Sequence, residues 1–452
     1  MKSLTLIYAP QPQDTKPLYS SEWCVPLGNL SIGTYIKDNG FDVKILDGAI
    51  LSYEDIEEEL DYSDNNSIVG FSTTILNLNQ SIRLAKKAKN KGSTIVFGGP
   101  QASGLSYNLI KTINEIDFVV RGEGESPMLE ILKGTNPKKI SNLTYRDGNE
   151  IRENYRVNSG VWTRFFPDRA LITEIEQYKK NWYNQNKEKE FTATNIGLQR
   201  GCSWGLCNFC TESREVRNGS LYDYFVNLRE LKERYGFNAF FEVSPGPSQK
   251  TLIDLLENRP DDLEDVRFRF YTYPNIITDK LVDILAELNT WEVFIGIESG
   301  DLKLLREVNA IKSDLSNLSK ETGYFDKTKK QVSKMRNKNI NSKVSYILGF
   351  EGETKDSLEK TYKNAREMVD AGASSIACSL LMPLPDTTIF QKILWHAKLG
   401  PKYKDEALID FTEITKDWID NFCSVPYEII VEYQSKIMGL VNKATAYGHI
   451  IF

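Results

Sequence analysis

The stretch LQRGCSWGLCNFCTES, residues 198–213, places three of the six cysteines of the chain close together. Cys202, Cys207 and Cys210 form a CxxxxCxxC pattern, and no histidine lies near them. Clustered thiols with this short spacing indicate a site that binds a metal group through sulfur. Which group they hold depends on the fold that carries the loop and on the ligands available elsewhere.

The overall composition is that of an ordinary globular protein. The chain has 452 residues, 40% of them hydrophobic and 26% charged, with a net charge of −6. This acidic balance disfavours the broad basic surface of a nucleic-acid-binding protein. The N-terminal residues lack the pattern of a signal peptide, and no apolar run is long enough to cross a membrane. We therefore expect a cytoplasmic protein, with no nucleic-acid or membrane partner, whose cysteines act as ligands rather than as disulfides.

Residues 1–140 alternate short apolar runs with helical patterns, which predicts a doubly wound, Rossmann-like α/β domain. The runs SLTLIYA, FDVKILD, SIVGFSTT, STIVFGG and IDFVVRGEG are expected to be parallel strands buried on both faces. Ligands of such sheets bind at the carboxyl ends of the strands. Three of these ends carry small or glycine-rich loops, at residues 72–74, 98–103 and 121–126. Each loop alone is typical of a tight turn, but three on successive strands favour a binding site.

The rest of the chain divides into three parts. Residues 141–193 are interpreted as a connector with a small hairpin around Asp147 and Gly148. Residues 194–395 contain six strand–helix units, which predict a partial (β/α)6, TIM-like barrel with the cysteine loop just after its first strand. Residues 396–452 are expected to form a small helical C-terminal region that serves as a substrate-binding lid.

The ligand count distinguishes between two kinds of metal site. A structural zinc site takes four cysteine or histidine ligands. This chain has only two histidines, His396 and His449, and both lie far from the loop in sequence. Three thiolates are better suited to an iron–sulfur cluster with one open iron, although a fourth ligand from a distant cysteine and a zinc or redox site stay open as alternatives.

The cysteine loop and its setting resemble the radical S-adenosylmethionine (SAM) enzymes, in particular the branch with an N-terminal cobalamin-binding domain. The resemblance covers the chain from the first strand to about residue 395. The usual motif of that family is CxxxCxxC with an aromatic residue before the last cysteine, a place that Phe209 fills. This sequence has one additional residue between Cys202 and Cys207, as expanded loops of radical SAM peptide maturases also have.

The resemblance implies a [4Fe-4S] cluster held by Cys202, Cys207 and Cys210, with SAM bound beside it. Along the barrel, FFEVS, FIGIESG and YILGFEGET are similar to the stretches that bind SAM in the family. They assign the amino group of SAM to Glu242, its ribose and carboxylate to Glu298 and Ser299, and its adenine to the stretch that contains Ile347, Gly349 and Gly352. In LMPLPDT, Asp386 replaces the glycine that is common at the end of the sixth strand.

The resemblance also implies cobalamin in the N-terminal domain. PLGNLSIGTYIKDNGFDVKILD is similar to the helix–strand signature of such domains, GGPQAS replaces a more common GGPHAS, and RGEGE is present. A DxHxxG motif, whose histidine ligates cobalt in some cobalamin enzymes, is absent, as it is in most relatives of this branch. The residues implied in cobalamin binding are Leu27, Gly28, Ser72, Thr73, Thr74, Gly98, Gly99, Gln101, Gly122 and Glu123.

The implied activity is cleavage of SAM to a 5′-deoxyadenosyl radical, followed by cobalamin-dependent methylation of an unactivated carbon. The expected substrate is a peptide or a small natural product, and the expected partner is an electron donor such as flavodoxin or ferredoxin. No catalytic side chain is assigned, because abstraction of a hydrogen atom needs no protein base. Two alternatives stay open: a radical SAM enzyme that does not methylate, with or without cobalamin, and a non-catalytic metal-binding protein.

Overall fold

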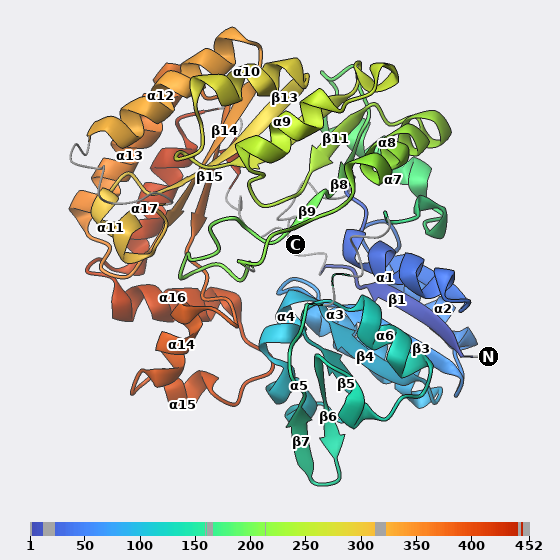
Figure 1. Cartoon of the computed structure of the whole chain (residues 1–452). Helices are drawn as coiled ribbons and strands as arrows, with labels where there is room; N and C mark the ends of the chain where they lie inside the picture. The colour runs from blue at the N-terminus through green and yellow to red at the C-terminus, as the bar shows by residue number, and fades with distance from the viewer. Residues whose placement is uncertain are drawn as a thin grey trace. The chain divides into compact units, whose positions relative to one another are not determined.

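The computed structural model describes residues 2–11, 23–158, 160, 166–212, 214–311, 322–441 and 444–445. The chain forms two compact units. The first unit contains residues up to 192, together with residues 384–386 and 394–409. The second contains residues 193–383, 387–393 and those from 410 onwards. The sheet of each unit is shown in Figure 1.

The first unit is built on a seven-stranded sheet in the order β2-β1-β3-β4-β5-β6-β7. The five predicted strands are confirmed as parallel neighbours, and two antiparallel strands extend the sheet. The chain passes to the other side of β1 when it enters β3, which makes the gap between these strands the switch point of the sheet. The strands are β1 (Ser3–Tyr8), β2 (Val43–Asp47), β3 (Ser67–Ser72), β4 (Thr94–Gly98), β5 (Phe118–Val120), β6 (Leu143–Asp147) and β7 (Glu150–Glu153).

Helices cover this sheet because the strands are apolar on both faces and each face needs a partner. Leu6, Ile68 and Val96, from three adjacent strands, are almost fully buried in the core. The helices of the unit are α1 (Leu27–Asp38), α2 (Tyr53–Glu59), α3 (Leu78–Asn90), α4 (Gly99–Gly104), α5 (Ser106–Thr112), α6 (Glu125–Leu132), α7 (Ile175–Gln185) and α15 (Gly400–Tyr403).

Residues 141–193 are not a separate connector, which differs from the sequence-based expectation. The hairpin around Asp147 is present, but its strand β6 pairs with β5 and adds Leu143 and Tyr145 to the core. Tyr178 of α7 is buried in the same core and donates a hydrogen bond to the carboxylate of Asp47 at the end of β2. The segment is mostly polar in sequence, so the few residues that it contributes to the core could not be recognised before the fold was known.

The second unit is a parallel sheet in the order β16-β15-β14-β13-β12-β11-β8, and a small antiparallel pair formed by β9 and β10 lies between β8 and β11 in sequence. Six of the seven strands are the six predicted barrel strands, and the two-residue strand β16 adds an edge. The strands are β8 (Ala193–Ile196), β9 (Gln199–Arg200), β10 (Arg217–Asn218), β11 (Ala239–Glu242), β12 (Arg267–Thr272), β13 (Thr290–Glu298), β14 (Asn341–Leu348), β15 (Ser375–Leu380) and β16 (Ala444–Thr445).

The helices of the second unit follow its strands in turn, as Figure 1 shows. Local signals fix their ends: the Ser220 side chain accepts a hydrogen bond from the amide of Asp223 at the start of α8, and Gly236 ends α8 in the left-handed conformation. The helices are α8 (Leu221–Tyr235), α9 (Gln249–Glu257), α10 (Asp279–Glu287), α11 (Leu302–Glu307), α12 (Thr322–Asn337), α13 (Lys355–Ala371), α14 (Thr388–Trp395), α16 (Phe411–Phe422) and α17 (Tyr427–Met438).

The C-terminal residues 396–452 do not form one separate region, which again differs from expectation. Residues up to 409 belong to the first unit, whereas α16 and α17 pack on the barrel of the second. Trp418 of α16 is fully buried and donates a hydrogen bond to the carbonyl of Gly349 (2.8 Å), so this aromatic residue is part of the core.

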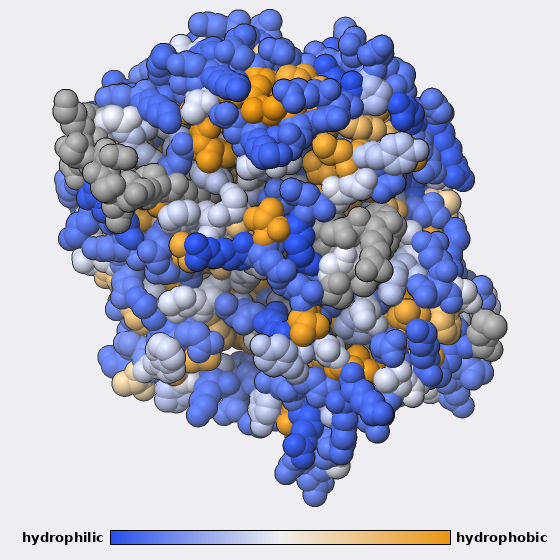
Figure 2. All heavy atoms as spheres, in the orientation of Figure 1, coloured by the Kyte–Doolittle hydropathy of each residue, from blue (hydrophilic) through white to orange (hydrophobic). Residues whose placement is uncertain are grey.

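Hydrophobic side chains appear as small separate patches on the face shown in Figure 2. Among the described residues, no helix is both long and apolar enough to span a membrane.

Candidate cofactor site

The three cysteines lie on the loop that follows β8, at the carboxyl end of the first barrel strand. Cys202 and Cys207 are partly buried and Cys210 is exposed. In the described part of the chain, no three cysteine, histidine or acidic side chains converge on a single metal ion. The cysteines of a [4Fe-4S] cluster bind different irons, so their sulfurs need not meet at one point. Three accessible thiols on one loop, with no competing ligand from the barrel, fit such a cluster.

The end of α11 fastens the cysteine loop to the barrel. The backbone amide of Asn208 donates to the carbonyl of Val308 (3.1 Å), and the indole of Trp204 donates to the carbonyl of Asn309 (2.6 Å). The Sγ atom of Cys207 lies 3.8 Å from the same Asn309 carbonyl oxygen. Asn309 has a positive φ of 55°, a conformation that asparagine tolerates well. Sequence reasoning missed Asn309, because its role depends on a contact about 100 residues away.

Phe209 connects the cysteine loop to the loop that follows β14. Its ring packs against that of Phe350, with ring centroids 5.3 Å apart. Phe350 stands directly after Gly349 in the stretch predicted to lie at the adenine of SAM. The fold therefore brings together the aromatic residue of the cysteine motif and the predicted adenine loop, which are separated by 140 residues in sequence.

Glu242 is the last residue of β11, and its carboxylate accepts hydrogen bonds from other residues of the chain. Oε1 accepts hydrogen bonds from the amides of Leu198 (2.9 Å) and Ser244 (3.0 Å) and from the Ser244 hydroxyl, and Oε2 accepts one from the hydroxyl of Tyr224 (2.8 Å). Burial raises the pKa of Glu242, and these hydrogen bonds oppose that shift. Through these bonds Glu242 holds Leu198 at the start of the cysteine loop, and its assignment to the amino group of SAM stays a prediction. Tyr224 gave no signal in the sequence.

Glu298 is the last residue of β13 and is nearly buried, with 6% of its surface exposed. Its φ of 69° lies in the left-handed region, and the pairing of β13 with β14 shifts register between Gly296 and Glu298. Strained backbone of this kind is often kept at functional sites. The buried hydroxyl of Tyr324 lies nearby: burial, and then the charges of Glu298 and Cys207, raise its pKa. Tyr324 is a third residue, after Asn309 and Tyr224, that the sequence did not assign to the site.

Ser299 directly follows β13, and its hydroxyl takes part in hydrogen bonds within the chain. It is 1% exposed, and its hydroxyl lies 3.2 Å from the hydroxyl of Thr361 on α13 and accepts a hydrogen bond from the amide of Asp301 (3.1 Å). The turn after β13 needs these bonds, because its backbone passes close to α13 at Gly300. Ser299 therefore holds this turn in place.

The loop after β14 contains two glycines with positive φ angles, a backbone conformation that favours glycine. Gly349 has a φ of 98°, and a Cβ atom there would lie 3.1 Å from Ile419 Cγ1 of α16. Gly352 has a φ of 77°, and its amide donates to the carbonyl of Phe422 (2.8 Å). The buried carboxylate of Glu353 supports the loop, since it accepts a hydrogen bond from the amide of Gly349 (3.1 Å). The predicted residue Ile347 is 4% exposed at the end of β14.

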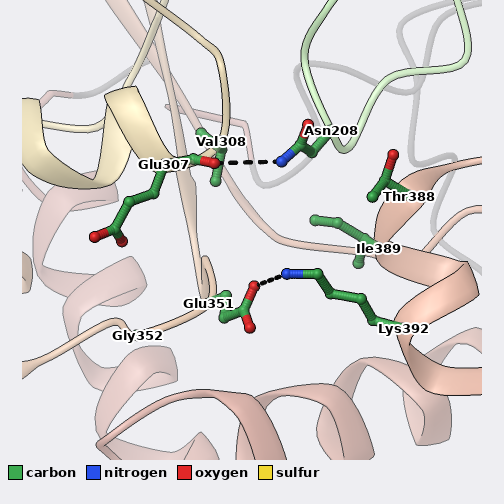
Figure 3. A pocket seen from close by; sticks show the side chains of 8 residues that line it. All are labelled: Asn208, Glu307, Val308, Glu351, Gly352, Thr388, Ile389 and Lys392. Atoms are coloured by element: carbon green, nitrogen blue, oxygen red, sulfur yellow. Dashed lines mark hydrogen bonds and ion pairs between the residues drawn. The ribbon is translucent and has the colours of Figure 1, made fainter. Parts of the chain in front are cut away.

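A pocket of about 400 Å³ lies beside the cysteine loop and is shown in Figure 3. It falls in the size range of small-molecule sites. An ion pair between Glu351 and Lys392 borders the pocket. Asn208 lies opposite this pair, and its side-chain amide donates to the carbonyl of Glu307 (3.3 Å). Gly352 is the only predicted SAM residue that lines it; the full lining is Asn208, Glu307, Val308, Glu351, Gly352, Thr388, Ile389 and Lys392.

In the first unit, the fold brings the predicted cobalamin residues to one edge of the sheet. Residues 72–74, 98–101 and 122–123 follow the adjacent strands β3, β4 and β5, and Leu27 and Gly28 open α1. Thr73 is fully buried, and its hydroxyl donates to the carbonyl of Gly98 (2.8 Å) and accepts from the amide of Ala102 (3.1 Å). Thr73 therefore joins β3 to α4.

Two observations at this edge fit a bound group. Gln101 and Asn29 are each 2% exposed, yet their amide nitrogens have no hydrogen-bond partner among the described residues. Buried donors without partners are costly, so a ligand that accepts their hydrogen bonds would stabilise them. Gly28 and Gly122 have no heavy atom within 4 Å of the place where a Cβ atom would stand. These features suit a cofactor rich in amide groups, such as cobalamin, and Asn29 is a residue that sequence reasoning missed.

Comparisons with known proteins agree with both halves of this description. The B12 binding domain family matches residues 22–132, and the Radical SAM superfamily matches residues 196–365. An uncharacterized methyltransferase of Pyrococcus horikoshii is 25% identical over 386 residues, which cover 81% of this chain and 78% of that protein. Anaerobic magnesium-protoporphyrin IX monomethyl ester cyclase of Rubrivivax gelatinosus is 23% identical, with coverage of 79% and 64%.

Two solved structures share the fold. The radical SAM methyltransferase TsrM of Kitasatospora setae, solved with cobalamin and a [4Fe-4S] cluster, superposes with a TM-score of 0.66 at 16% identity and covers 87% of this chain and 76% of its own. The cobalamin-dependent radical SAM enzyme OxsB, with aqua-cobalamin, gives a TM-score of 0.65 at 16% identity, with coverage of 95% and 58%. The predicted fold class is therefore confirmed.

The fold and the two matched domains define a radical SAM enzyme, which excludes the alternative of a non-catalytic metal-binding protein. The chain carries a B12-binding domain and a radical SAM domain and is related to cobalamin-dependent radical SAM methyltransferases. Its domains imply a [4Fe-4S] cluster, SAM and cobalamin as cofactors.

Proposed function

We propose that the enzyme methylates an unactivated carbon of a ribosomally made peptide or a small natural product. The observation that carries the proposal is a three-cysteine loop at the mouth of a parallel barrel, in a chain that also has a B12-binding domain. A relative of known substrate class, cytidylyl-2-hydroxyethylphosphonate methyltransferase of Streptomyces wedmorensis, is 22% identical over 83% of this chain and 79% of its own length.

Within the barrel, Cys202, Cys207 and Cys210 would hold the cluster. Phe209, Ile347, Gly349 and Gly352 would surround SAM, and Glu298 would contact it at the strained end of β13. Glu242 and Ser299, whose side chains bond to the chain itself, would hold the surrounding backbone in place.

In the first unit, Asn29 and Gln101 would donate hydrogen bonds to cobalamin, and Gly28 and Gly122 would let it approach the backbone. The remaining proposed contacts are Leu27, Ser72, Thr74, Gly98, Gly99 and Glu123. When bound, the cluster and SAM supply radical chemistry at an unactivated carbon, and cobalamin supplies a methyl carrier. The protein contributes binding, orientation and exclusion of water. An electron donor such as flavodoxin or ferredoxin would reduce the cluster, and the reducing cytoplasm would keep the thiols free.

A second candidate is a radical SAM reaction without methylation, such as cyclisation, epimerisation or rearrangement. The specific observation in its favour is the similarity to a cyclase, which covers 79% of this chain. The two candidates differ in their products. Methylation converts SAM to S-adenosylhomocysteine as well as to 5′-deoxyadenosine, whereas the second candidate needs only the latter.

The test uses full-length protein, purified and reconstituted without oxygen and supplied with hydroxocobalamin. Iron and cobalt are counted per chain after desalting, and SAM products are measured after addition of a chemical reductant. About four irons, about one cobalt and both SAM products would support the methyltransferase. Four irons without retained cobalt would favour the second candidate, and a preparation that binds no iron would contradict both.

A further inference from the structure

The interior of the barrel in the second unit carries charged side chains that the cofactors do not need. The side chains of a strand alternate between two faces, and paired residues of neighbouring strands share a face. Tyr346 of β14 donates a hydrogen bond to Asn364 of α13, so Tyr346 lies on the face that the helices cover. Lys343, Ser345 and Ile347 therefore lie on the opposite face, inside the barrel.

The same reasoning places an arginine and a glutamate inside. Lys343 pairs with Phe294 of β13, and Glu292 stands two positions before Phe294, on the same face. Glu292 pairs with Arg269 of β12. The Arg269 Nε donates to Glu292 Oε1 (2.6 Å), and its guanidinium lies 4.1 Å from the centroid of the Phe241 ring. Three adjacent strands thus direct two cations and one anion to one place in the barrel.

Within this group, the positive charge of Lys343 is not balanced by an ion-pair partner among the described residues. The Arg269 and Glu292 side chains are paired with each other, whereas the ammonium of Lys343 makes no hydrogen bond or ion pair with any described residue. Its nearest described aromatic partner is Phe294, whose ring centroid lies 5.9 Å away. Burial, and then the charge of Arg269, lower the pKa of Lys343 to about 8, and the charge of Glu292 opposes this shift. An unpaired, partly buried cation of this kind is a poor structural element but a good anion ligand.

The position of the lysine relates it to the reaction site. Ile347, on the same face, is at the mouth of the barrel and lies four positions further along β14. At about 3.3 Å per residue, Lys343 is about 13 Å deeper in the barrel. The side chains of Arg269 and Glu292 keep 12% and 24% of their surfaces exposed, so the group is not sealed.

We propose that Lys343 and Arg269 bind an oxyanion, a carboxylate or a phosphate, on the part of the substrate that lies about 13 Å deeper in the barrel than Ile347. The inference rests on the proposed function, because it assigns the interior of the barrel to the substrate. Arg269, fixed by Glu292 and Phe241, would present a rigid donor, and Lys343 would supply the uncompensated charge. The substrate is then an elongated molecule with an acidic end, which narrows the class of peptide or natural product.

The test follows the reactivity of Lys343 in full-length, reconstituted protein. A low concentration of sulfosuccinimidyl acetate, whose leaving group on acyl transfer is not acetate, is added at a slightly alkaline pH. Acetylation is measured by peptide mass spectrometry, with and without an excess of inorganic phosphate or acetate. Exposed Lys363 on α13 serves as the internal control. We expect either anion to protect Lys343 but not Lys363, and the more protective anion identifies the class of the acidic group. Equal effects on both lysines, or a Lys343 that is never acetylated, would overturn the proposal.

A second measurement distinguishes a specific loss of anion binding from misfolding of a variant. Binding of the protecting anion is measured by calorimetry for the wild type, Lys343→Met, Lys343→Arg and Lys363→Met. We expect Lys343→Met to weaken binding by about tenfold or more, with Lys343→Arg and Lys363→Met near the wild type. Unchanged binding to Lys343→Met would refute the assignment. Iron and cobalt counts on the same samples report on the proposed function separately, since failure to hold the cofactors leaves the anion result readable.

Discussion

Glu353 offers the sharpest test of the loop that surrounds the proposed SAM site. It is 1% exposed, accepts a hydrogen bond from the amide of Gly349 (3.1 Å) and one from the hydroxyl of Ser357 (2.5 Å). Burial raises its pKa from 4.5 to about 7, against the effect of these hydrogen bonds. The folded protein therefore favours the protonated carboxyl. Its contribution to stability is complete below the unfolded pKa of 4.5 and is lost as the pH rises through about 7.

The size of the effect follows from linkage. With pKa values of 4.5 unfolded and about 7 folded, ionisation of Glu353 costs about 0.8 kcal/mol at about pH 5 and about 3.3 kcal/mol at about pH 8. Glu353→Gln keeps the size of the side chain and an acceptor for the Gly349 amide, but it does not ionise. Relative to the wild type, the variant should therefore gain about 2.5 kcal/mol in free energy of unfolding between about pH 5 and pH 8.

The assay is guanidinium unfolding followed by tryptophan fluorescence at the two pH values, because Trp418 packs on this loop. Glu351→Gln is the matched control, because it makes the same chemical change at an exposed position of the same loop. A Glu353→Gln difference that stays constant between the two pH values would refute the reasoning.

Three further substitutions, two of them with a control variant, test the site. Cys207→Ala should remove the bound iron and abolish formation of 5′-deoxyadenosine, whereas Cys423→Ala should keep the iron content; full activity of Cys207→Ala with no loss of iron would contradict the cluster assignment. Gly349→Ala should lower the free energy of unfolding by about 2 kcal/mol or more, from backbone strain and crowding against α16. Gly148 also has a positive φ, but no atom lies near the place of its Cβ, so Gly148→Ala should lower the free energy of unfolding through backbone strain alone. If calorimetry gives the same loss of stability for both variants, crowding at Gly349 does not contribute. Tyr224→Phe removes a donor from the buried carboxylate of β11 and should cost about 1–3 kcal/mol in denaturant unfolding, so an unchanged midpoint would mean that this bond is not needed.

The order of strands and helices was readable from the sequence, because parallel strands buried on both faces leave unbroken apolar runs. The runs that became β1, β3 and β4 carry this signal clearly. The segment 141–193 does not, since its contribution to the core rests on a few residues, such as Tyr145 and Tyr178, within a polar stretch. For the same reason, the division of residues 396–452 between the two units could not be predicted.

The sequence by itself determined the order of the two α/β repeats and the presence of a three-thiol loop after the first strand of the second repeat. The chemical class was implied by the resemblance of these stretches to radical SAM enzymes. Only the tertiary structure decided which polar side chains are hydrogen-bonded within the chain. Glu242 and Ser299 have the residue types of cofactor ligands, and the structure shows that their side chains bond to Leu198 and Thr361. Lys343 has no motif at all and emerges only when three strands are paired in register. The physical reason is that a side chain's role depends on which donors and charges lie within a few ångströms, and those neighbours come from distant parts of the sequence.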